Sequence, residues 1–349
     1  MQTLGKFLAA LCAVLFIISG VLVLILFHIE QKAFSSATYK KAFEDQSLYE
    51  RTPEILATAL TTSIVQHQGT LPFLNTVKVE DWQSIISFLL PPEELKALSD
   101  NALDSTFDYL NLKTDTANIS LLPIKSRLVG ESGMNVVLQI LRLQPECTLE
   151  QLTQMALGFL GGQIALCNPP PEAIQLMTPL IQSQLQALVT VFPNEVTFIS
   201  DARSGTPDDP RLKLSTVRSV IILTPILPAL FLFGIVVFAV RSLRDWLIWW
   251  GWPLMMTGLI SVLIALVGSP LVGWILQLLI RTQISILIPP VLSASIAETA
   301  SAVASEILSP VVIEGIILAV VGLGSVILAV FIGNRPNSNS YPGLEYPRV

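Results

Sequence analysis

Few side chains in this 349-residue chain could carry out acid–base or metal chemistry. Paired carboxylates, which general acid–base catalysis or a metal ion could use, occur at Glu93–Glu94 and Asp208–Asp209. The first pair fits the opening turn of a helix, where the helix dipole favours negative charge, and the second fits a polar turn. His67, one of 2 histidines, lies in the polar stretch QHQGT and fits a solvated loop. We therefore predict no catalytic residue, no cofactor and no metal site, and an enzyme is not expected.

The cysteines favour a disulfide. Cys147 and Cys167 are the two cysteines outside the apolar runs, and no further Cys or His ligand lies near them in the sequence. In an oxidising compartment they can pair, and closing a loop of about 20 residues would contribute about 3 kcal/mol. Two unrelated buried thiols are the alternative. Cys12 lies inside an apolar run and is interpreted as a buried thiol.

The composition is that of an integral membrane protein. Hydrophobic residues make up 52% of the chain and charged residues 13%, with a mean hydropathy of +0.65, whereas a soluble domain carries about 25% charged residues. Most of the 26 acidic and 20 basic residues lie between the first and second apolar runs. That segment is composed like a soluble domain. Because it is mildly acidic, it gives no reason to expect nucleic-acid binding.

Four apolar runs are long enough to cross a membrane. The run from Phe7 to Phe27 carries no charge and is followed by no small-residue cleavage pattern, so we expect an uncleaved signal anchor; a cleaved signal peptide is the alternative. Pro225 and Pro228 should loosen the start of the second run. We expect the cytoplasmic N-terminus and first span at 1–28, the second span at 218–240, the third at 249–273 and the fourth at 311–333.

Basic residues and tryptophans predict the orientation. Lysines and arginines mark the cytoplasmic side of membrane proteins, and tryptophans gather at the interface. With four spans, the basic positions fall on one side, which places both termini, the turn 241–248 and a disordered tail 334–349 in the cytoplasm. The basic positions are Lys6, Arg241, Arg244, Arg335 and Arg348, and the expected interfacial anchors are Trp246, Trp249, Trp250 and Trp252.

Residues 29–217 should then form a mostly helical domain outside the membrane. The patterns predict two helices broken near Thr52–Pro53, and a short helix capped by Asp81. Further helices are expected after Pro91–Pro92, after Thr148, and over 133–143 and 171–191. The segments ANISL and EVTFI could pair as two strands, and 201–214 reads as a polar linker to the membrane.

A second exported segment, 274–310, is predicted to be amphipathic and to face either the large exported domain, which it would hold against the bundle, or the outer membrane surface. Its apolar positions Val291, Leu292, Ile296, Val303 and Ile307 should face the partner. Arg281 and Glu314 could pair at the outer mouth of the bundle, or each could extend separately to the interface. In the fourth span, small residues form a face for close helix packing: Gly315, Ala319, Gly322 and Gly324.

The predicted fold is mainly α, a four-transmembrane-helix protein with a large exported domain between the first two spans. We expect it in a plasma membrane, that of a bacterium, as a non-enzymatic envelope protein whose exported domain serves binding, sensing or assembly. One alternative is a channel or transporter subunit whose pore forms on oligomerisation, and another is a membrane-bound hydrolase. The expected partners are the lipid bilayer and an unknown protein or envelope ligand, with a homo-oligomer as a further option.

Overall fold

The fold divides into two compact units. The computed structural model describes residues 2–66, 77–158, 167–283 and 290–333. One unit, here the bundle unit, comprises 1–31, 217–268 and 307–349; the other, the domain unit, comprises 32–216 and 269–306. Several helices continue from one unit into the other.

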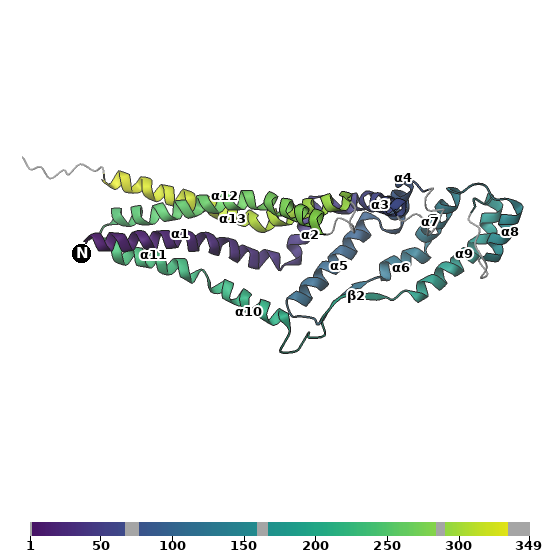
Figure 1. The fold of residues 1–349 in the computed structure, drawn as a ribbon, viewed down its shortest axis with the longest axis horizontal. Coiled ribbons are helices and arrows are strands. Elements are labelled where there is room, and N and C mark those ends of the chain that lie inside the picture. The colour runs from purple at the N-terminus through teal and green to yellow at the C-terminus, as the bar shows by residue number, and fades with distance from the viewer. Residues whose placement is uncertain (1, 67–76, 159–166, 284–289, 334–349) are drawn as a thin grey trace, which may run out of the picture. The chain divides into compact units, whose positions relative to one another are not determined.

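The bundle unit is built from long apolar helices that run side by side (Figure 1). The part of the chain that the structure describes contains four helical segments long and apolar enough to cross a membrane: Leu4–Ala33, Pro210–Ala239, Leu243–Ile280 and Leu292–Ile332. They agree with a multi-pass membrane protein. Their helices are α1 (Gln2–Ala33), α10 (Pro210–Leu223), α11 (Ile226–Ala239), α12 (Leu243–Gln283) and α13 (Pro290–Gly333).

Proline interrupts the second segment where expected. Helix α10 ends at Leu223, and α11 starts after Pro225, which cannot donate a backbone hydrogen bond. The Thr224 hydroxyl donates to the Ile221 carbonyl oxygen at 2.6 Å and so satisfies one acceptor at this break.

Glycines allow α12 and α13 to pack closely. A Cβ on Gly251 would lie 2.8 Å from the Gly322 carbonyl oxygen, and one on Gly315 would lie 3.0 Å from the Gly258 carbonyl oxygen. The order of these contacts makes the two helices antiparallel. The small-residue face predicted for the fourth span is thus confirmed at Gly315 and Gly322, whereas a Cβ on Gly324 would meet nothing within 4 Å.

Helices α12 and α13 are longer than the spans predicted for them. Each continues through part of the segment 274–310. Hydropathy identifies the stretch of a helix that can lie in lipid, but it does not show where the helix itself ends. Lys41 and Arg51 pair with Glu306 and Glu298 of α13 at 2.9 and 3.1 Å within the domain unit. The side chain of Ile296 is 40% exposed, so it is not part of the buried face of this segment. That face is formed by small residues: Ser293, Ala297 and Ala304.

The domain unit is mostly helical. Apart from the ends of the long helices it contains α2 (Ser36–Asp45), α3 (Leu48–Gln66), α4 (Val79–Leu89), α5 (Pro92–Leu110), α6 (Leu122–Val129), α7 (Glu131–Arg142), α8 (Leu149–Gly158) and α9 (Pro171–Val191). The predicted strands also form: β1 (Thr116–Ser120) pairs antiparallel with β2 (Glu195–Ser200). One hydrophobic core joins α7, α8 and α9 and includes Leu141, Met155, Met177, Ile181 and Leu185.

One local prediction in this unit is wrong. The break between the first two helices falls at Ser47, which adopts a positive φ of 47°, and Pro53 lies inside α3. Asp81 does cap its helix, but from the third helical position of α4, where its carboxylate accepts a hydrogen bond from the Lys78 backbone N–H at 3.2 Å. Both helices therefore begin a few residues earlier than their sequence signals indicate.

Candidate functional sites

Two ion pairs fix the end of α1 within the bundle unit. Arg218 of α10 donates from Nη2 and Nε to one Glu30 carboxylate oxygen at 2.9 and 3.1 Å. The His28 Nε2 lies 3.3 Å from the Glu314 Oε1 on α13. His28 and Glu30 are two positions apart, so they point to different sides of α1. They therefore connect α1 to α13 on one side and to α10 on the other.

The His28 ring also contacts its own helix. The His28 Nδ1 lies 2.8 Å from the Leu24 carbonyl oxygen, which can only accept, so this nitrogen can donate to it. Both ring nitrogens of His28 therefore have a polar neighbour, the Leu24 carbonyl oxygen on α1 and the Glu314 carboxylate on α13.

The Arg281–Glu314 pair predicted from the sequence would involve the carboxylate that contacts His28. Glu314 contacts His28, and the side chain of Arg281 lies outside the described part of the structure. Sequence reasoning missed His28, although a histidine directly after an uncharged 21-residue run was a signal for it. The partner of His28 could not be predicted from the sequence, because Glu314 lies on a helix far away along the chain.

Two hydroxyl groups in α12 are buried without hydrogen-bond partners. Thr257 and Ser261 are 1% and 0% exposed, and neither Thr257 Oγ1 nor Ser261 Oγ has a partner. They are four residues apart and so lie on one face of the helix. Thr257 meets α1 at Gly20, where an added Cβ would lie 3.0 Å from its Cγ2. The bundle therefore contains polar groups beside α1, in addition to the two ion pairs.

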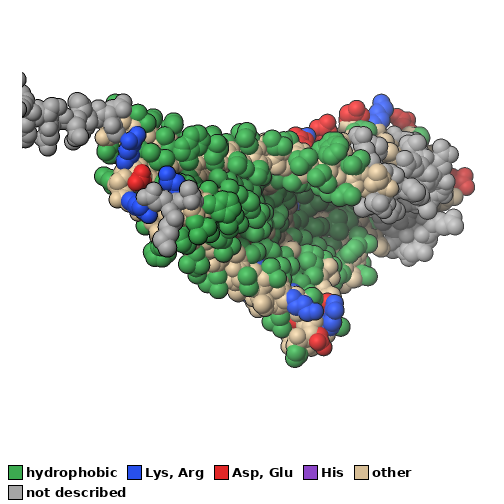
Figure 2. All heavy atoms as spheres, turned by 60° about the vertical axis from the view of Figure 1, so that its left-hand side comes forward, with side chains coloured by type: hydrophobic (Ala, Val, Ile, Leu, Met, Phe, Trp, Pro, Cys, Tyr) green, Lys and Arg blue, Asp and Glu red, His purple; other side chains and the backbone are tan. Residues whose placement is uncertain are grey.

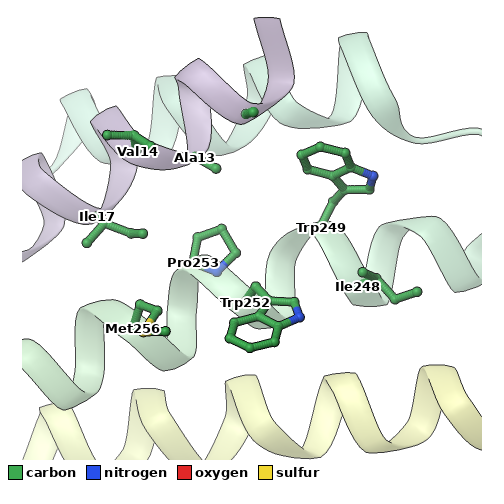
Figure 3. A pocket seen from close by; sticks show the side chains of 9 residues that line it. Ala13, Val14, Ile17, Ile248, Trp249, Trp252, Pro253 and Met256 are labelled. Carbon is green, nitrogen blue, oxygen red and sulfur yellow. The ribbon is translucent and has the colours of Figure 1, made fainter. Parts of the chain in front are cut away.

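A groove lies between α1 and α12 in the bundle unit (Figure 3). It has a volume of about 340 Å³, which falls within the usual range of ligand pockets. Small or compact residues create the space: Ala10 and Ala13 on α1 and Pro253 on α12. Larger apolar side chains complete its walls, namely Val14, Ile17, Ile248, Trp249, Trp252 and Met256.

The four predicted interfacial tryptophans gather at the start of α12. The rings of Trp246 and Trp250 lie 5.1 Å apart, while Trp249 and Trp252 line the groove. Trp252 is 49% exposed. Their position at the membrane surface remains a prediction.

In the domain unit, Cys147 and Cys167 form the predicted disulfide. The Cys147 backbone N–H also donates to the Asn168 carbonyl oxygen at 3.1 Å, which holds the two segments together beside the bridge. Thr148 caps α8 as expected: its hydroxyl accepts from the Gln151 N–H, and the Gln151 side chain accepts from the Thr148 N–H. A cavity of about 560 Å³ next to the bridge is bordered by Arg142, Glu146 and the prolines 169–171.

A buried arginine organises the end of the segment predicted to be a polar linker. Arg211 is 4% exposed, and its Nη2 donates to the Asp209 carboxylate at 2.7 Å. Its Nη1 donates to the carbonyl oxygens of Tyr109 and Thr114 at 2.8 and 2.6 Å, and its guanidinium lies 4.1 Å from the centre of the Tyr109 ring. Hydrogen bonds from Arg211 lower the pKa of Asp209 to about 2. This contact ties the start of α10 to the end of α5.

The β1–β2 sheet is covered on one edge and open on the other. The Ser105 hydroxyl of α5 accepts from the Asn118 N–H at 2.8 Å, and the Asn101 side chain accepts from the Ser120 N–H at 3.2 Å. Asn118 and Ser120 thus point their N–H groups away from β2. In an antiparallel pair their partners, Thr197 and Glu195, point their own backbone groups away from β1. The outer edge of β2 is left open by the described residues.

Apolar side chains flank this open edge. Leu188 and Val191 lie on one face at the end of α9, and Phe192 directly follows the helix. Val196 and Phe198 are two residues apart in β2, so their side chains lie on the same face of the sheet. Their exposed fractions are 47%, 84%, 49%, 37% and 45%. We call these five residues the α9–β2 surface.

The carboxylate pairs serve local structure. Glu93 and Glu94 lie in the first turn of α5, as predicted, and Asp209 accepts from the backbone N–H groups of Gly205 and Arg211. Over the described ranges no group of three His, Cys, Asp or Glu side chains is placed to hold a metal ion. His67 lies outside these ranges.

Comparison with known proteins gives no function that could be transferred to this chain. No family model, no curated protein and no solved structure matches it. What the fold supports directly is a mostly helical chain with four apolar helical segments in the pattern of a multi-pass membrane protein.

Proposed function

We propose that this protein is a non-enzymatic plasma-membrane protein that binds another polypeptide outside the cell membrane, through strand addition at β2. In this proposal residues 29–217 are exported and both termini are cytoplasmic. The observation that carries the proposal is the open edge of β2. A six-residue strand with one covered neighbour and one open edge offers backbone donors and acceptors that a further strand can satisfy.

The α9–β2 surface supports a protein partner. Val191 and the neighbouring apolar residues are exposed beside the open edge, and large apolar patches on soluble domains mark interaction sites. Lipid tails could cover apolar side chains but could not pair with the backbone groups of Thr197. A polypeptide strand satisfies both requirements.

Substitution at Thr197 tests strand addition directly. Thr197→Pro removes an outward N–H without removing a hydrogen bond to β1, and proline is tolerated on the outer side of edge strands. Thr197→Ala is the matched control, because it also loses the side-chain hydrogen bond from Thr197 to Asn118 but keeps the N–H.

The readout is photocrosslinking in native membranes. A photoreactive residue at Phe198 should give one discrete protein adduct, whose mass identifies a second copy of the chain or another protein. We expect the adduct to persist in T197A and to fall at least tenfold in T197P. The same probe at Leu149, which is 85% exposed on α8, should not give this adduct. An equal adduct in T197P and T197A, or adducts with lipid alone, would refute strand addition.

A second function, proton or ion transport, is favoured by the polar groups in the bundle. The His28 Nε2 lies 3.3 Å from the Glu314 carboxylate, and the hydroxyl groups of Thr257 and Ser261 are buried without partners. Beyond Thr257, toward the start of α12, the contacts with α1 are apolar, which counts against a continuous path in a single copy. Proton flux into proteoliposomes that is lost in Glu314→Gln would favour transport over binding alone.

A further inference from the structure

We propose that the groove between α1 and α12 binds one acyl chain of an anionic phospholipid, whose phosphate contacts Lys6 and Arg244. This site goes beyond the proposed partner binding, since it lies in the bundle unit and requires no exported domain.

The groove suits a lipid chain in three respects. Its walls are apolar along their length from Ala10 to Ile17 and from Ile248 to Met256 (Figure 3). Ala10 to Ile17 covers about 10 Å of helix, at 1.5 Å per residue. Both walls belong to helices long and apolar enough to cross a membrane, so the surrounding medium supplies the ligand.

Each wall continues into a cation at the same end. Lys6 precedes Ala10 by four residues on α1, and Arg244 precedes Ile248 by four residues on α12, so each cation lies on the helix face that lines the groove. Both side chains are exposed, and Figure 2 shows basic side chains gathered at the end of the bundle unit where α13 ends. Asp245 is also at this end, but Arg241 adds a further cation, and the sum is positive.

Tryptophans mark the level at which the headgroup would lie. Trp249 directly follows Ile248 and Trp252 lies about one turn beyond it, and both line the groove. Indole rings favour the boundary between headgroups and acyl chains. A phospholipid with its chain between Ala13 and Pro253 would therefore have its phosphate near Lys6 and Arg244. Charge complementarity selects an anionic over a zwitterionic headgroup.

Native mass spectrometry of the full chain in detergent tests the site. The protein is incubated with equal amounts of phosphatidylglycerol and phosphatidylcholine of identical acyl chains. We expect one phosphatidylglycerol to be retained in preference to phosphatidylcholine. Lys6→Gln and Arg244→Gln should each weaken phosphatidylglycerol retention about fivefold, the factor that corresponds to about 1 kcal/mol per basic residue. Ala13→Phe should fill the groove and abolish retention of both lipids.

Two controls separate a site from general attraction. Arg241→Gln removes the same charge from the same turn but precedes α12 and lies on neither wall, so retention should stay within twofold of wild type. Leu263→Phe enlarges an exposed side chain of α12 outside the groove and should also leave retention unchanged. Equal retention of both lipids by wild type, or equal losses in R241Q and R244Q, would overturn the proposal. The charge variants alter no packed residue, so they decide the question even if A13F does not fold.

Discussion

Asp209 and Arg211 form a buried ion pair that ties together residues far apart in the sequence. Asp209 is 2% exposed. Its carboxylate accepts hydrogen bonds from the backbone N–H groups of Gly205 and Arg211 and from the Arg211 guanidinium. Arg211 in turn donates to the carbonyl oxygen of Tyr109 at the end of α5 and to that of Thr114 in the segment after α5. Breaking a buried pair is costly, since it leaves one charge without its partner. We therefore expect this pair to control how firmly the 201–211 segment is held.

The pH dependence of this contact follows from the lowered pKa. The pKa of Asp209 is about 2 in the folded protein, against an ordinary value of 3.8, so its contribution to stability is present above about pH 4 and is lost as the pH falls toward 2. We expect the Tm of Asp209→Asn to lie well below that of wild type at pH 6, and the gap to shrink between pH 4 and pH 2. The exposed neighbour offers a control, Asp208→Asn, whose Tm should follow wild type across this range. A gap that stays constant down to pH 2 would contradict this account.

At the scale of elements, glycines decide how closely α12 and α13 approach. A Cβ on Gly258 would lie 3.0 Å from the Ala319 Cβ and nearer still to the backbone of Gly315. Without strong hydrophobic driving force between helices in lipid, such close contacts are a main source of helix association.

Replacing single glycines in this pair of helices should have opposite effects. Gly258→Ala forces the helices apart and should destabilise the protein by about 1–3 kcal/mol, the usual cost of overpacking. Gly324→Ala adds a methyl group in open space and should stabilise α13 by up to about 1 kcal/mol through helix propensity. Thermal unfolding in one detergent, followed by circular dichroism, measures both. If the two variants shift the Tm equally, close packing is not what holds these helices.

The elements that could be predicted from the sequence are those with local causes. Helix α9 begins and ends as expected because Pro171 starts it and Pro193 follows it, and β1 and β2 form from β-favouring residues. The extents of α12 and α13 were underestimated, because hydropathy does not report helix that continues beyond the apolar run. The sites were largely missed. The His28–Glu314 and Arg211–Asp115 contacts join residues 286 and 96 positions apart, and no local pattern specifies such pairs.

At the scale of the whole molecule, charge and disulfide chemistry bear on the same question of orientation. Lys6, Arg241 and Arg244 lie at one end of the bundle unit, which should be cytoplasmic. The Cys147–Cys167 bridge belongs to the domain unit, and disulfides persist in oxidising compartments. An exported domain unit and cytoplasmic termini satisfy both observations.

Thiol labelling tests this orientation in sealed, right-side-out membrane vesicles. In a Cys12→Ser background, a membrane-impermeant maleimide should label Cys147 and Cys167 only after reduction, with the vesicles still sealed. A cysteine introduced as Ser242→Cys, in the turn before α12, should be labelled only once the vesicles are opened. Reduction should also lower the stability of the domain unit by about 3 kcal/mol, because the unfolded chain regains the freedom of a loop of about 20 residues. Labelling of S242C in sealed vesicles would show that the orientation is the opposite of the proposed one. It would place β2 and its proposed partner in the cytoplasm, where the Cys147–Cys167 bridge would not persist.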